Sequence, residues 1–154
     1  MKMGHLFTQG TVDSNEIWLD IKVTSGDRVI GRSGGRDADS EVDPWSHFVN
    51  VYVIDKNGDR IARRNVQDIF VAVYNNQIPP GAAAVVHYAL DVPDDVSGSI
   101  TVTLKLNYRK FDKQFTDFMT STAKPGDMSI RDHRHGERAE ERRVGKDARS
   151  RWSP

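Results

Sequence analysis

Histidines are the side chains in this sequence most suited to binding a metal or transferring a proton. There are five: His5, His47, His87, His133 and His135. His133 and His135 are the closest pair, but their charged segment supplies no arranged set of carboxylate ligands, and spacing alone is weak evidence for a metal site. His87 lies in an apolar alternating run, as an ordinary sheet residue would. We therefore expect no dedicated metal site.

Two glycine-containing loops have the composition of ligand loops. Residues 55–59, DKNGD, look like a calcium loop, but its twelfth position, which requires a bidentate Glu, is Val66. The Asn-Gly pair instead predicts a hairpin turn. Residues 33–36, SGGR, offer backbone amides to an anion, but no helix begins after them to add its dipole. Neither loop predicts a ligand site.

The residues of common catalytic sites are missing or dispersed. The chain has no cysteine, which excludes a thiolate zinc site, a cysteine nucleophile and an iron–sulfur cluster. It also excludes a CxxCH motif, so the chain cannot attach its own haem c. Its carboxylates fall mainly at turns, where Asp caps the backbone. We predict that the protein is not an enzyme and holds no cofactor in this chain.

Four aromatic side chains are candidates for an interaction surface: Trp45, Tyr52, Tyr74 and Tyr88. Aromatic residues are enriched at binding surfaces, although those in strands more often belong to the core. They keep open the alternative that the chain is a free-standing carbohydrate- or protein-binding module.

The elements that would position these side chains are short segments in which apolar and polar residues alternate. Such alternation is typical of half-buried strands. Six segments show it: 16–24, 28–32, 47–54, 69–75, 84–92 and 99–108. Turn signals separate them, and residues 111–119 fit either a last strand or a short helix. The pattern predicts an all-β fold, an immunoglobulin-like antiparallel β-sandwich of about seven strands with Trp18 in its core.

Charge divides the chain into a body and a tail. Overall, 22 basic residues balance 22 acidic ones, but residues 1–123 carry 13 basic and 16 acidic side chains, whereas residues 124–154 carry 9 and 6. The segment 124–154 has too few large apolar residues to offset its ordering entropy, which predicts a disordered C-terminal tail after a β-sandwich domain at 1–123. The acidic residues in the tail dilute its arginines, so we expect no nucleic-acid partner. No apolar run predicts a membrane span, and the first residues lack the apolar stretch of a signal peptide.

A series of motifs, in order along residues 4–118, is more specific than this alternation. It begins with Gly4-His5-Leu6-Phe7, continues to Gly10, Asp13 and Trp18-Leu19, and resembles the start of the β-rich C-terminal domain of multihaem c-type cytochromes. The later motifs are Ser33-Gly34-Gly35, Asp55-Lys56-Asn57-Gly58, Ile78-Pro79-Pro80-Gly81, Leu106-Asn107-Tyr108-Arg109-Lys110-Phe111 and Thr116-Asp117-Phe118. Thr8 stands where the family has Pro. The strand that precedes Gly-His in the family and the haem-bearing part are not in this sequence.

The resemblance implies a non-catalytic accessory domain of a periplasmic or extracellular electron-transfer protein. Its partner would be a multihaem cytochrome domain in cis or in trans, and haem c would lie only in that upstream or partner segment. His5 is the candidate axial ligand to such a haem, because imidazole is a usual axial ligand. The alternative role of His5 is to hydrogen-bond its own loop. A missing upstream strand would also leave a sheet edge open for self-association.

Overall fold

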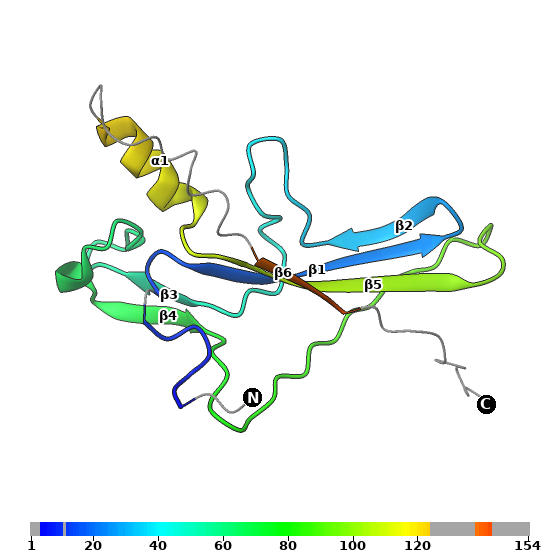
Figure 1. Ribbon diagram of the computed structural model, residues 1–154, viewed down its shortest axis with the longest axis horizontal. Coiled ribbons are helices and arrows are strands. Elements are labelled where there is room, and N and C mark those ends of the chain that lie inside the picture. Colours follow the sequence, from blue (N-terminus) through cyan, green and yellow to red (C-terminus); the bar gives the residue numbers. More distant parts are fainter. Residues whose placement is uncertain (1–3, 11, 124–137, 143–154) are drawn as a thin grey trace.

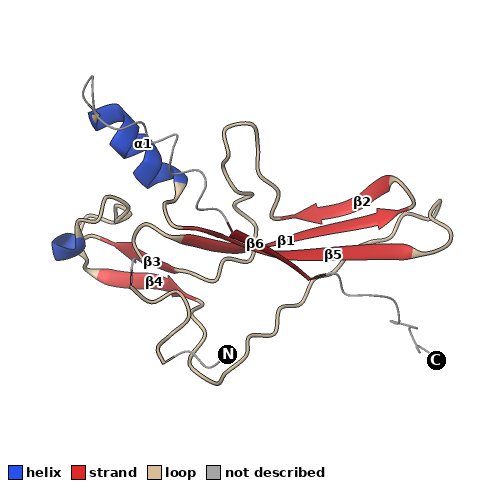
Figure 2. Ribbon diagram, viewed as in Figure 1, coloured by secondary structure: helices blue, strands red, loops and turns tan. Residues whose placement is uncertain are grey.

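The computed structural model describes residues 4–10, 12–123 and 138–142, the last of these by backbone only. Its strands form two antiparallel sheets (Figures 1 and 2). The larger sheet has the order β2-β1-β5-β6 and the smaller pairs β3 with β4. The elements are β1 Glu16–Ser25, β2 Arg28–Ser33, β3 Val51–Ile54, a 3-10 turn η1 Val66–Asp68, β4 Val71–Asn75, β5 Ile100–Arg109, α1 Lys113–Thr122 and β6 Arg138–Arg142.

The pairing of β1 with β5 is the longest in the molecule and follows from their alternation. Ten residues of each strand are in register, and Leu19 faces Leu106 while Ile21 faces Leu104. Because side chains alternate between the faces of a sheet, Leu19 and Ile21 share one face with their partners in β5, and Trp18 lies on the other face. This ladder is the frame on which the rest of the domain is arranged.

Residues 47–50 join the two sheets. The amide of Leu19 donates a hydrogen bond to the carbonyl of His47 at 3.0 Å. The amide of Val49 donates one to the carbonyl of Ile17 at 2.9 Å. After these contacts the chain turns away from β1 and continues as β3. At this bend the side chain of Asn50 accepts a hydrogen bond from Ile17 N at 2.9 Å and donates one to Asn15 O, also at 2.9 Å. Asn50 thereby replaces the missing ladder partner, which explains why a polar residue is buried here.

The core lies where the sheets meet. Trp18 is only 2% exposed, packs with Val42 and Phe48, and donates its indole N–H to Gly34 O at 3.0 Å. A second cluster joins Val51, Val53 and Ile61. The fold is therefore rich in antiparallel strands with Trp18 buried, as the sequence predicts.

The predicted strand at 84–92 does not form. These residues run without regular structure between β4 and β5, below the larger sheet in Figure 1. Side-chain alternation is a necessary feature of a strand, but a ladder also needs a neighbouring backbone. No described strand pairs with this segment, so its alternating pattern alone does not make it a strand.

Two other predicted strands are shorter than expected, and the ambiguous segment is a helix. Only Val51–Ile54 of 47–54 and Val71–Asn75 of 69–75 belong to the β3–β4 ladder. Residues 113–122 form α1, because Asp112 caps it by accepting a hydrogen bond from Phe115 N at 2.8 Å.

Within residues 124–154, which the sequence predicts to be a disordered tail, the structure describes residues 138–142. These five residues form β6, which pairs with Leu104–Tyr108 of β5. The rest of the predicted tail lies outside the described residues. Five strands lie within residues 16–109 and β6 is added from the tail, so the predicted count of about seven strands in the body is not reached.

Candidate functional site

A cleft of about 540 Å³ opens beside the junction of the two sheets and the start of α1. Its walls combine aromatic rings with paired charges. The principal lining residues are Glu16, Phe48, Tyr52, Arg60, Tyr74, Arg109, Asp112 and Lys113. A mixture of this kind suits a polar ligand that also presents an apolar face.

The Glu16–Arg109 ion pair forms the inner part of the cleft. Arg109 donates to one carboxylate oxygen of Glu16, and their side chains are 9% and 8% exposed. Arg109 also donates to Ser40 O at 2.8 Å, and its guanidinium carbon lies 5.6 Å from the ring centroid of Trp18. These contacts hold the pair rigidly between β1 and β5, which bring the two residues into register.

A second ion pair, Arg60–Asp112, lies nearer to solvent. Arg60 Nη2 is 2.8 Å from Asp112 Oδ2, and the guanidinium carbon lies 4.3 Å from the ring centroid of Tyr52. Asp112 uses its other oxygen to cap α1. One carboxylate therefore connects the helix terminus to the hairpin after β3.

Burial controls the electrostatics of the cleft. Desolvation raises the pKa of Glu16, and the charge of Arg109 opposes that rise without cancelling it. Desolvation also raises the pKa of Asp112, against the hydrogen bond from Phe115 and the charge of Arg60. The pKa of the Tyr52 hydroxyl is raised by burial as well. These groups are held in a partly water-excluded environment, in which a bound polar group would interact strongly.

The structure brings two of the four predicted aromatic residues together. The rings of Tyr52 and Tyr74 lie edge to face with centroids 5.6 Å apart, and Tyr74 donates its hydroxyl to Phe48 O at 2.8 Å. Trp45 is 90% exposed beside the cleft residues Pro44 and Ser46. The hydroxyl of Tyr88 contacts the backbone of His47, the residue before Phe48.

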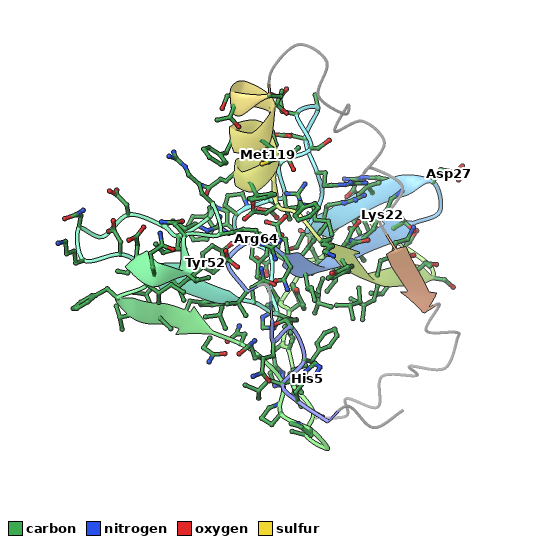
Figure 3. All side chains as sticks on the ribbon, turned by 60° about the vertical axis from the view of Figure 1, so that its left-hand side comes forward. His5, Lys22, Asp27, Tyr52, Arg64 and Met119 are labelled. Carbon is green, nitrogen blue, oxygen red and sulfur yellow. The ribbon has the colours of Figure 1, made fainter. Side chains whose placement is uncertain are left out.

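His5 lies in the N-terminal loop, well away from the cleft and from α1 (Figure 3). It is exposed, and its Nδ1 is 2.8 Å from the carbonyl of Leu6. The loop is anchored by an antiparallel bridge between Phe7 and Ile78. With Nδ1 bonded to a carbonyl, Nε2 is the nitrogen that a metal would take.

The backbone of the same loop has a conformation at position 8 that proline cannot adopt. Thr8 has a φ of +81°, whereas proline is fixed near −65°. A proline at position 8 would therefore require a different loop conformation. Thr8 is instead buried, with its hydroxyl 3.3 Å from Gln77 Nε2.

The two glycine-containing loops have structural contacts. The amides of Asn57 and Asp59 donate to Asp55 Oδ1 at 2.8 and 2.9 Å, and these bonds lower the pKa of Asp55. The hairpin-turn interpretation of 55–59 is thus confirmed. In the other loop, Gly34 N donates to Asp43 Oδ2 at 3.1 Å. The Gly34 amide, which could otherwise bind an anion, is therefore already hydrogen-bonded to a carboxylate of this chain.

Among the described residues, no group of three or more His, Asp or Glu side chains is placed to hold a metal ion. His47 and His87 belong to different segments, and His133 and His135 lie outside the described residues. Nor is any described helix long and apolar enough to cross a membrane.

Sequence reasoning missed the four charged residues of the cleft: Glu16, Arg60, Arg109 and Asp112. The alternation at 16–24 placed Glu16 on the solvent side of its strand, yet it is buried. Glu16 and Arg109 are 93 positions apart, so only the strand register brings them together. Asp112 alone had a local signal, since Asp is a preferred residue before a helix.

Chemically, the arrangement offers recognition groups: the donors of Arg60 and Lys113, the edges of two tyrosine rings and one buried ion pair. The carboxylates of Glu16 and Asp112 each pair with an arginine, and Asp112 also accepts a hydrogen bond from a backbone amide. Searches of protein families, curated proteins and solved structures for relatives of this chain found no match.

Proposed function

We propose that the chain is a non-catalytic interaction domain that packs against a multihaem c-type cytochrome domain, in cis or in trans. The supporting observation is an uncharged, exposed stretch: residues 69–90 contain no Asp, Glu, Lys or Arg, although 29% of the chain is charged. Phe70, Val73 and Val85 in this stretch are 71%, 61% and 79% exposed. Exposed apolar surface without charge is typical of a protein interface.

The resemblance of residues 4–118 to the cytochrome-associated domain supplies the identity of the partner. On this proposal the complex is periplasmic or extracellular, and haem is bound by the partner segment. His5 is the residue proposed to reach a haem there, because its loop is exposed and its Nδ1 hydrogen bond orients the ring. The two antiparallel sheets and the buried Trp18 support an immunoglobulin-like sandwich as the parent fold.

The test is an antibody against residues 10–120 applied to fractions of the source cells, followed by a haem stain of the same gel. We expect the antibody to detect a large haem-stained band, or to precipitate a separate haem-stained polypeptide together with the 17.4 kDa chain. Recovery of the chain without any haem-stained protein from every fraction would contradict the proposal.

Substitutions should localise the contact. Val73→Asp places a charge in the uncharged stretch and should reduce co-precipitation, whereas Lys56→Asp in the exposed hairpin turn should not. His5→Ala should alter the visible absorption spectrum of the complex without preventing its assembly, if His5 is an axial ligand.

A second candidate function is a free-standing carbohydrate- or protein-binding module, favoured by the cleft with Tyr52, Tyr74 and Arg60 in its wall. A glycan panel tests the carbohydrate form of this alternative. Binding that is lost in Tyr52→Ala, and retained in Trp45→Ala, would support the cleft as the ligand site.

A further inference from the structure

The segment 84–92 has the side-chain pattern of a strand but no partner backbone. Hydrogen bonds from Ala82 N to Pro79 O and from Val96 N to Pro93 O close turns on either side of it. Between these turns, no backbone-to-backbone hydrogen bond links residues 83–92 to any other described residue. Its peptide groups are therefore available to a strand from outside the described part of the chain.

Contacts with the body of the domain fix which side of this segment faces inward. Leu90 packs so closely on β2 that a Cβ atom at Gly31 would lie 2.8 Å from its Cδ1. Tyr88 contacts the backbone of His47, and Asp95 forms an ion pair with Arg28. Tyr88 and Leu90 thus lie against the body of the domain, where they are 44% and 40% exposed, while Val85 is 79% exposed. The body therefore covers the even-numbered side of the segment only in part.

In an extended segment, the side that carries Val85 also carries His87 and Asp91. In an antiparallel pair of two such segments centred on Ala89, His87 lies opposite Asp91 of the partner subunit. By symmetry, Asp91 lies opposite His87 of the partner subunit. The inner face then sets Tyr88 opposite Leu90 of the partner subunit. A register centred on Tyr88 would instead place Asp91 opposite Val85, so the pairing of an imidazole with a carboxylate selects Ala89 as the centre.

We propose that the segment 84–92 is a dimerisation strand, whose occupant is the same segment of a second copy of this chain. The two strands pair antiparallel about a two-fold axis at Ala89, and the interface is isologous. The pairing provides the backbone neighbour that the alternating pattern lacks within one chain. The proposal does not depend on a cytochrome partner, because its contacts are made between two copies of residues 84–92.

Charge exchange tests the register. Sedimentation velocity of the full chain should show a concentration-dependent dimer. His87→Asp sets two like-charge pairs across the axis and should raise the dissociation constant about tenfold. The double variant His87→Asp with Asp91→His restores opposite partners and should recover the wild-type dissociation constant. Asp27→His, in the exposed β1–β2 turn, is the matched control and should have no effect.

A cross-link tests the axis independently. The chain has no cysteine, so Ala89→Cys introduces a single thiol. In the proposed dimer this thiol lies opposite the same thiol of the partner subunit. Directly opposed residues in an antiparallel pair have Cα atoms about 4.5 to 5.5 Å apart, within the range of a disulfide. Mild oxidation should give a covalent dimer with Ala89→Cys but not with Ser97→Cys, which lies outside the proposed ladder.

Three results would overturn the proposal. The first is a monomer at every accessible concentration. The second is a dimer that His87→Asp does not weaken or that the double variant does not restore, since that dimer would use another surface. The third is cross-linking that is equal for Ala89→Cys and Ser97→Cys. Failure of the cytochrome interaction would leave all three measurements unaffected, so the two proposals are separable.

Discussion

At the scale of residues, the strongest constraint is the buried Glu16–Arg109 pair. Both side chains are almost fully removed from solvent, so neither charge can be hydrated if the other is lost. Arg109→Met should therefore lower the free energy of unfolding by about 3 to 5 kcal/mol, because it leaves a buried carboxylate without its cation. Urea denaturation followed by Trp fluorescence measures this change, since Arg109 lies close to Trp18.

The matched control for Arg109→Met is Lys113→Met. Lys113 forms an ion pair with Asp117 one helical turn away, and the Asp117 side chain is 59% exposed. Exposed pairs of this kind contribute little, so the control should lose much less stability than Arg109→Met. Equal losses in the two variants would show that burial of the Glu16–Arg109 pair has no energetic consequence.

Glu16 should also impose a pH dependence on stability. Burial raises its pKa in the folded protein above the usual value of 4.5, so the folded state binds this proton more tightly than the unfolded chain does. The stabilising contribution is fully present below the usual pKa and is lost as pH rises through the raised pKa. The free energy of unfolding of the wild type should therefore fall, relative to that of Glu16→Gln, as pH rises above the usual pKa of 4.5.

Unfolding titrations of the two proteins at several pH values provide the measurement. The contribution of Asp112, whose pKa is also raised, remains in both and largely cancels in the difference. An increase in the stability of the wild type relative to Glu16→Gln with rising pH would be the opposite result. It would mean that the attraction of Arg109 exceeds the desolvation of Glu16.

At the scale of elements, the sequence predicts those strands whose pattern and partner both exist. β1 and β5 alternate cleanly and pair over their whole length, so the local signal and the long-range contact agree. The segment 84–92 alternates equally well but has no neighbour in the described chain, and periodicity carries no information about neighbours. The cleft was not predictable for the same reason: Glu16 and Arg109, far apart in sequence, meet only through the β1–β5 register. Only α1 had a local start signal, Asp112.

The loop after β2 shows how closely two elements can be fitted together. Gly34 has a φ of +84°, and a Cβ there would lie 2.0 Å from the carbonyl oxygen of Leu19 in β1. Gly34→Ala should thus lower the free energy of unfolding by more than about 2 kcal/mol, from backbone strain and a direct clash. It should also displace the carbonyl that accepts the Trp18 indole hydrogen bond, which near-ultraviolet circular dichroism would detect.

Gly58→Ala separates these two causes. Gly58 has a similar φ of +91°, but nothing lies within 4 Å of its ideal Cβ. Gly58→Ala should therefore lower the free energy of unfolding by the backbone strain alone, about 1 to 2 kcal/mol. If both variants were equally destabilised, the close approach of the loop to β1 would have no energetic effect.

At the scale of the whole molecule, the two sheets differ in how their edges are protected. In the larger sheet, β6 covers residues 104–108 of β5, while Ile100 and Val102 at the other end of β5 remain exposed. In the smaller sheet, the exposed residues Val71 and Val73 of β4 belong to the uncharged stretch. Exposed apolar strands of this kind promote association with other chains. The uncharged stretch and segment 84–92 are the surfaces to which the two proposed interactions are assigned.

The C-terminal segment should act as an edge cover for β5 more than as a determinant of the fold. β6 is five residues long, and its sequence, RAEER, is rich in Glu and Arg and lacks β-branched or aromatic residues. Deletion of residues 138–154 should leave the ten-residue β1–β5 ladder intact and lower the free energy of unfolding by no more than about 1 kcal/mol. Amide hydrogen exchange should accelerate at those residues of Leu104–Tyr108 whose N–H groups face β6, while β1 amides keep their protection. Unchanged exchange in β5 would show that β6 does not cover this edge in solution, and the edge would then be a third open surface for a partner strand.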